Sequence, residues 1–180
     1  ACRSARKLMK ISTAPIPNNS GLLIAFQSRA DLLDGGADTG VSQVYWAEYD
    51  KKNHTSILRR LTNGNGPSLH PYVSEVNSFI VFESSATNLP GTVGGAGSSI
   101  YMSTLLTAPS PQPPTLRQLT VPTDFGNCSY PVVDAGSVAD HIGFVCDGDP
   151  LGNSTVGNRV FVIELSSLTL FQLTGSGDVQ

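Results

Sequence analysis

The sequence predicts an all-β fold, an array of three four-stranded antiparallel sheets. Short apolar phrases recur three times in register, separated by stretches rich in turn formers, with 18 Gly and 12 Pro among 180 residues. No stretch of ten residues keeps the 3.6-residue apolar period of an amphipathic helix. The phrases are therefore expected to be short strands.

A phenylalanine anchors each copy of the repeat, at Phe26, Phe82 and Phe144. A leucine follows each of them after seven residues, and an aromatic residue follows after 19, 19 and 17 residues. The copies are offset by 56 and 62 residues, and each ends on Leu-Thr. A repeat of this length, made of short apolar runs, is typical of propeller blades or related arrays.

Four strands are expected in the first copy, at residues 8–15, 22–27, 42–48 and 56–62. The first alternates apolar and polar residues, whereas the second is a nearly continuous apolar run, typical of a strand buried on both faces. Residues 17–21 separate them as a turn, because Asn and Gly tolerate positive φ.

The other two copies repeat the pattern. The second is expected to have strands at residues 69–74, 79–83, 99–104 and 115–120, with a Gly-rich loop at 90–97 and a Pro-rich loop at 108–114. The third is expected to have strands at residues 129–133, 141–146, 159–165 and 169–174.

The predicted organisation is one continuous domain of three blades, 8–62, 63–120 and 121–174, with tails at 1–7 and 175–180. Four strands forming a small antiparallel sheet are the anatomy of a β-propeller blade. The blades are expected to pack face to face through one apolar set: Ile24, Phe26, Ile80, Phe82, Ile142 and Phe144.

The phrases Ile-Val-Phe-Glu-Ser-Ser-Ala-Thr-Asn-Leu (80–89) and Leu-Arg-Gln-Leu-Thr (116–120) resemble the WD40-like propeller repeats of TolB and related proteins. The resemblance covers about residues 9–174. It implies a propeller-type fold with a binding or scaffolding role and no catalytic residues. The chain departs from it in two ways: the Ser-Pro-Asp-Gly turn of those repeats is replaced in every copy, and three blades are fewer than such propellers usually close with.

Composition argues against nucleic-acid binding and against a membrane-spanning segment. The net charge of −3 and the 14% of charged residues provide no basic patch for nucleic acid, and no apolar run approaches the roughly 18 residues of a membrane span. The first seven residues are not followed by the apolar stretch of a signal peptide, although a mature form would lack one too.

Two features favour an exported protein. The first is a set of four Asn-x-Ser/Thr sequons in expected loops, at Asn18, Asn53, Asn127 and Asn153. A Ser/Thr-rich chain also produces such sequons by accident. The second is a predicted disulfide between Cys128 and Cys146.

Cys128 and Cys146 flank a predicted hairpin whose midpoint is residue 137. That register places Val132 opposite Ile142, Tyr130 opposite Phe144 and Cys128 opposite Cys146, close enough for a disulfide. The alternative is a pair of buried free thiols. Cys2 is left over, either free or paired between chains.

The sequence shows little sign of a catalytic or metal-binding site, and neither catalytic residues nor a metal or cofactor is expected. The three histidines, His54, His70 and His141, have no metal-ligand spacing. Solvated turn acids are the ordinary interpretation of Asp147, Asp149, Asp34 and Asp38, with Ca²⁺ binding as the alternative. Trp46 is expected to pack between sheets, with sugar stacking as the alternative.

Two function classes remain. The first is a structural or interaction protein that assembles with itself head to tail, as ring or filament, or docks a protein partner. It is favoured because the first blade (Leu22, Leu23, Ile24, Phe26) and the last (Val160, Phe161, Val162, Ile163, Leu168, Leu170) are as apolar as the middle one. Residues 1–12 are expected to lend a strand across the joint. The second is an extracellular propeller domain that binds carbohydrate or another ligand, either by itself or as a fragment of a larger enzyme-associated propeller. The apolar end blades also have a competing explanation, that the three blades belong to a longer chain that closes by itself.

Overall fold

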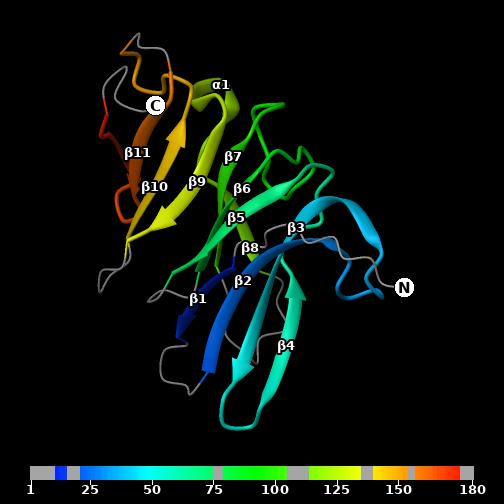
Figure 1. Cartoon of the computed structure of the whole chain (residues 1–180). Coiled ribbons are helices and arrows are strands. Elements are labelled where there is room, and N and C mark those ends of the chain that lie inside the picture. The colour runs from blue at the N-terminus through cyan, green and yellow to red at the C-terminus, as the bar shows by residue number, and fades with distance from the viewer. Residues whose placement is uncertain are drawn as a thin grey trace.

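The computed structural model describes residues 11–15, 21–74, 79–104, 114–134, 140–153 and 157–174. These residues form three four-stranded antiparallel sheets (Figure 1). Sheet 1 contains β1 (Ile11–Pro15), β2 (Gly21–Ala30), β3 (Asp38–Asp50) and β4 (Thr55–Arg60). Sheet 2 contains β5 (Ser68–Val73), β6 (Phe79–Ser84), β7 (Ser99–Thr104) and β8 (Thr115–Gln118). Sheet 3 contains β9 (Cys128–Val133), β10 (His141–Cys146), β11 (Arg159–Glu164) and β12 (Thr169–Gln172).

The prediction of an all-β chain with antiparallel sheets is confirmed. Strands β2 and β3 are longer than expected because the loop between them is tight: the Asp31 N–H donates to the Ala37 carbonyl, and the Gly36 N–H donates to the Asp31 carbonyl. One helical turn was not predicted, α1 (Pro122–Phe125). The expectations for residues 1–10, 16–20, 105–113 and 175–180 lie outside the described residues.

Within each sheet the strands follow one another in chain order, and sheet 2 lies between the other two (Figure 1). All six residues of its strand β6 are buried, because side chains on both faces of this strand meet another sheet. We call the two contacts between sheets the first seam and the second seam.

The first seam joins sheets 1 and 2. Sheet 2 contributes Val73, Ile80, Phe82 and Tyr101, and sheet 1 contributes Leu23, Ala25, Val44, Trp46 and Leu61. The second seam joins sheets 2 and 3. Here sheet 2 contributes Phe79, Val81 and Ile100, and sheet 3 contributes Val133, Ile142, Phe144, Phe161 and Ile163.

The predicted packing set is correct for sheets 2 and 3 but wrong for sheet 1. Ile80, Phe82, Ile142 and Phe144 lie in the seams, each facing the preceding sheet. Ile24 and Phe26 alternate with Leu23 and Ala25, so they lie on the face of sheet 1 that points away from sheet 2, where they are half-buried. Among the described residues no sheet precedes sheet 1 to cover them.

The predicted register of the β9–β10 hairpin is correct at its open end and wrong near its turn. Cys128 faces Cys146, but Val132 faces Gly143 rather than Ile142. The shift arises from a β-bulge at Tyr130–Pro131, where Tyr130 has a φ of 55°. Strand β5 has the same feature at His70–Pro71, with a φ of 50° at His70.

Candidate functional site

The repeated Leu-Thr dipeptide forms hydrogen bonds with the third strand of each sheet. The hydroxyl oxygens of Thr62, Thr120 and Thr174 accept the N–H groups of Val44, Ile100 and Val160 at 2.9, 2.8 and 2.9 Å. In each sheet the preceding leucine N–H donates to the carbonyl of that same residue of the third strand. The Leu-Thr dipeptide, the most regular part of the repeat, therefore has a structural role within each sheet.

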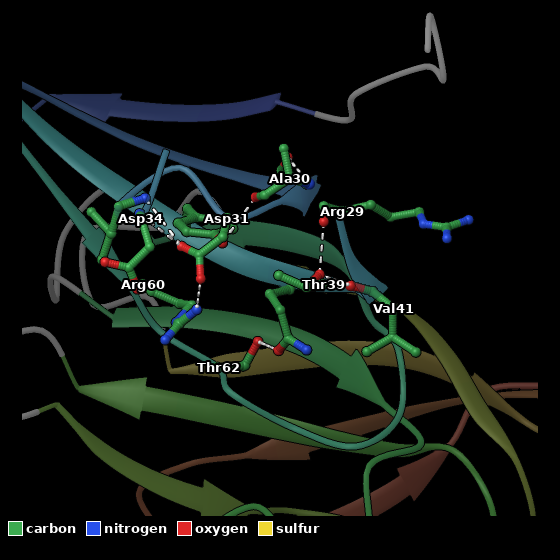
Figure 2. A network of polar contacts seen from close by, with 12 residues as sticks. Arg29, Ala30, Asp31, Asp34, Thr39, Val41, Arg60 and Thr62 are labelled. Atoms are coloured by element: carbon green, nitrogen blue, oxygen red, sulfur yellow. Dashed lines mark hydrogen bonds and ion pairs between the residues drawn. The ribbon is translucent and has the colours of Figure 1, made fainter. Parts of the chain in front are cut away.

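A side chain of each fourth strand pins the loop between the second and third strands. In sheet 1 the Arg60 guanidinium donates to Asp31 Oδ2 at 2.7 Å, and Figure 2 shows the two side chains pointing toward each other. At the equivalent position of sheet 2, Gln118 binds the backbone N–H and carbonyl of Val93. In sheet 3, Gln172 accepts from the Asn153 amide.

In sheet 1, the Asp31 carboxylate accepts hydrogen bonds from Arg60 and from the backbone of the turn. Burial alone would raise the pKa of its carboxyl group, but the N–H groups of Leu33 and Asp34 and the charge of Arg60 outweigh burial and lower this pKa below 3.8. Asp31 is therefore ionised at neutral pH, where its charge holds the tight turn together.

Each seam contains one polar contact of the same kind, which we call the seam latch. In the first seam, Gln27 Oε1 accepts the N–H of His70 at 2.7 Å. In the second, Glu83 Oε2 accepts the N–H of Tyr130 at 2.7 Å. Both acceptors directly follow the anchor phenylalanine, and both donors are bulge residues before a proline. The latch thus satisfies a bulge N–H that lies at the seam.

The second latch carries two further side chains. His70 Nδ1 lies 3.0 Å from Glu83 Oε1, and the His70 ring packs on the Tyr130 ring with centroids 4.6 Å apart. Glu83 is buried, and its Oε2 accepts the Tyr130 N–H, whereas its Oε1 lies beside His70 Nδ1 without a hydrogen bond to it. This arrangement suits a structural contact between sheets.

The sequence pattern did not reveal the latches, since donor and acceptor are 43 and 47 residues apart. Two features of the sequence could have indicated the latches. A polar acceptor follows the anchor phenylalanine of one copy, and an X-Pro dipeptide occurs in the next copy.

Cys128 and Cys146 form a disulfide that joins the open end of the β9–β10 hairpin beside the second seam. Three of the four sequons lie among the described residues. Asn53, Asn127 and Asn153 are all exposed, and their side-chain amides bond Asp50, Asp147 and Gln172, respectively. Asn18 lies outside the described residues.

The four acids considered for Ca²⁺ are distributed over two sheets, and three of them bond neighbouring turn or loop residues. Asp147 accepts from the backbone and side chain of Asn127, whereas Asp149 caps the N–H of Asn153 and lies 3.6 Å from the buried Arg159. In sheet 1, Asp38 pairs with Arg29 at 3.1 Å, and Asp34 is exposed. The neighbouring arginines reduce the negative charge that a cation would need.

The histidines and the tryptophan occupy unrelated positions. His54 bonds the Tyr49 hydroxyl, and His141 lies 2.7 Å from Asp140 and 3.3 Å from Asp134. The hairpin brings Asp134 to this pair, which sequence reasoning had not foreseen. Trp46 is 3% exposed in the first seam, with the Arg59 guanidinium over its ring, so the expected packing role is confirmed.

The remaining feature is a pair of apolar sheet faces. We define the leading face by Leu22, Ile24, Phe26, Ala47 and Leu58 of sheet 1, and the trailing face by Val132, Val145, Val160, Val162, Phe171 and Leu173 of sheet 3 and its flanks. All eleven side chains are half-buried or exposed. On the trailing face Val132 and Phe171 are each 47% exposed, and Leu173 is 64% exposed.

No protein-family model matches the chain, and no curated protein sequence matches it significantly. Of the helices in the described part of the chain, none has the length and apolar character needed to cross a membrane.

Proposed function

We propose that the chain is an exported, non-enzymatic interaction protein. Its three sheets form a propeller-type array that binds further protein, copies of itself or a partner, through the leading and trailing faces. The observation that carries this proposal is the exposure of apolar positions whose equivalents are buried in both seams. Ile24 and Phe26 correspond to the fully buried Ile80 and Phe82, and the exposed Leu173 corresponds to Leu61.

Both faces are large enough for their burial to stabilise an assembly. Burying one large apolar side chain contributes about 1.5–3 kcal/mol, and each face presents at least four such side chains. Contiguous apolar patches on a monomer mark interaction sites. The faces are therefore expected to be covered in the working form of the protein.

Three features support the propeller-type architecture. Each sheet is a four-stranded meander, successive sheets pack face to face, and the Leu-Thr phrase has the same structural role in each copy. The resemblance to the WD40-like repeats of TolB points to the same architecture. The three sheets of the described residues leave two faces uncovered, and the proposed assembly covers them.

Export is supported by the disulfide, because such bonds persist in oxidising compartments. The three exposed sequons are accessible to glycosylation in a secreted protein. The alternative function is glycan binding. Trp46, the side chain considered for stacking on a sugar, is buried and therefore not accessible to one.

The test is light scattering on the 180-residue chain with its disulfide intact, together with a glycan array. We expect a mass above 18.9 kDa that falls on dilution, and no specific glycan binding. A folded monomer at micromolar concentration that recognises a glycan would replace the proposal with the alternative.

A further inference from the structure

The turn end of the β9–β10 hairpin brings together three side chains that can bind a metal ion. We propose that Asp134, Asp140 and His141 bind Zn²⁺ and so hold this end of the hairpin, as the disulfide holds its open end. The site lies within one chain, so it does not depend on the proposed assembly.

Strand pairing places the three residues next to one another. Asp134 directly follows β9, and its N–H donates to the carbonyl of His141, the first residue of β10, at 3.2 Å. Asp140 precedes His141, and its carbonyl accepts the N–H of Leu165, which directly follows β11, at 2.6 Å. Strands β9, β10 and β11 lie side by side in sheet 3 (Figure 1). The backbone of the site is therefore held by three neighbouring strands.

Both carboxylates converge on one ring nitrogen. His141 Nδ1 lies 2.7 Å from Asp140 Oδ1 and 3.3 Å from Asp134 Oδ2. The ligand atoms of the three side chains all lie within 4.8 Å of one another. In a tetrahedral zinc site with bonds of about 2.0–2.2 Å, neighbouring ligand atoms are about 3.3–3.6 Å apart. The three atoms are therefore close to the spacing that a single ion requires.

The histidine alone cannot satisfy both carboxylates. A ring nitrogen carries at most one proton, so His141 Nδ1 can donate to Asp134 or to Asp140 but not to both. The other carboxylate then faces that nitrogen with no proton between them. In the described part of the chain, neither aspartate forms an ion pair with a lysine or an arginine. A divalent cation between the three groups would neutralise both carboxylates.

The surroundings of the site are also negatively charged. Residues 128–174 include five acidic side chains and one arginine. That arginine, Arg159, is fully buried and lies on the opposite face of the sheet from His141. Glu164 is the residue paired with His141 in β11, so it adds a carboxylate on the same face as the site. A surface of this charge attracts cations.

The ligand set indicates which metal binds. Zn²⁺ accepts both histidine nitrogen and aspartate oxygen as ligands. Ca²⁺ instead takes about six to eight ligands, all of them oxygen. The imidazole of His141 therefore distinguishes this site from the turn acids Asp147 and Asp149, which offer oxygen alone. Three protein ligands leave the fourth position of a tetrahedral ion to water or to a ligand from outside the chain.

Isothermal titration calorimetry with ZnCl₂, and with CaCl₂ in parallel, tests the site in the 180-residue chain after dialysis against EDTA, with the disulfide intact. His141→Ala removes the nitrogen ligand, and Asp134→Asn and Asp140→Asn each replace a carboxylate by an amide of the same shape. His54→Ala is the matched control, because His54 is an exposed histidine of sheet 1 that bonds the Tyr49 hydroxyl. Circular dichroism shows that each variant is folded.

The wild type and the His54→Ala control are expected to bind one Zn²⁺ ion at this site with equal affinity. His141→Ala, Asp134→Asn and Asp140→Asn are each expected to weaken binding at least about 100-fold, because loss of a group that merely supports a metal ligand already costs about 10–100-fold. Zn²⁺ is also expected to slow amide exchange at Asp134 and Leu165, whose N–H groups bond the backbone of the site.

Four outcomes overturn the inference. A wild type that binds no Zn²⁺ has no such site. Unchanged Zn²⁺ affinity in His141→Ala places the ion elsewhere in the chain, for example at Cys2. Weakened binding in His141→Ala with unchanged binding in both aspartate variants shows a histidine that binds zinc without the carboxylates. Equal binding of Ca²⁺ and Zn²⁺, in the wild type as in His141→Ala, shows only an acidic surface that attracts cations.

Discussion

At the scale of single residues, Glu83 connects three strands. It extends from β6, accepts the bulge N–H of β9 and lies beside His70 of β5. A buried carboxylate is costly unless it is hydrogen-bonded, so the position of Glu83 in the seam is explained by the Tyr130 N–H that it accepts.

Glu83→Ala is expected to lower the free energy of unfolding by about 1–3 kcal/mol, because it leaves the Tyr130 N–H at the seam without an acceptor. Glu83→Gln retains an acceptor oxygen and is expected to lose less. Urea denaturation of the two variants under conditions that keep the chain monomeric measures the difference. Equal losses would assign the effect to the charge of Glu83 rather than to the latch.

Phe26 and Phe82 occupy the same place in the repeat but differ in burial, so they form a matched pair. Phe82→Ala is expected to cost about 3–5 kcal/mol of unfolding free energy, as for a buried phenylalanine. Phe26→Ala is expected to cost no more than about half of that, since Phe26 keeps part of its solvent contact. A loss below about 1 kcal/mol for Phe82→Ala would contradict its position in the first seam.

At the scale of elements, the sequence predicted most strands because Gly-, Asn- and Pro-rich turns mark their ends. It did not predict the four-residue α1, which is too short to show a period, or the bulges at His70 and Tyr130. The misplacement of Ile24 and Phe26 has a different cause. All three copies carry the same alternation, and only the neighbouring sheet decides which face of a copy is covered.

The latches and the exposed faces depend on pairing between copies, which local periodicity cannot report. The cysteine pair was accessible to sequence reasoning because it lies at the open end of one hairpin, before the bulge. A hairpin register propagates only as far as the first irregularity.

The β2–β3 turn provides a test of pH dependence at this scale. The folded-state pKa of Asp31 is lowered, so its ionised form contributes stability that is present above its ordinary pKa of 3.8 and is lost as pH falls through the folded-state value. The wild type is therefore expected to be more stable than Asp31→Asn at neutral pH. This difference is expected to shrink below pH 3.8 in denaturant titrations at a series of pH values. A difference that is independent of pH would show that the turn does not depend on the charge.

At the scale of the whole molecule, sheet 2 holds the other two sheets together. Sheets 2 and 3 are each covered on the face that points toward the preceding sheet. The leading face of sheet 1 and the trailing face of sheet 3 are open. Sheets 1 and 3 therefore each have one stabilising seam, whereas sheet 2 has two. Local stability is expected to decrease from the middle of the array toward both ends.

Amide hydrogen exchange tests this gradient and connects it to assembly. In dilute solution, β6 is expected to exchange more slowly than β2 and β10, its equivalents in the outer sheets, because it is buried on both faces. Raising the protein concentration is expected to slow exchange in β2 and β10 while leaving β6 nearly unchanged, since only the outer sheets gain a neighbour. Equal exchange in all three strands at low concentration would mean that the sheets unfold as one unit. A concentration effect confined to β6 would contradict the placement of the binding faces at the two ends.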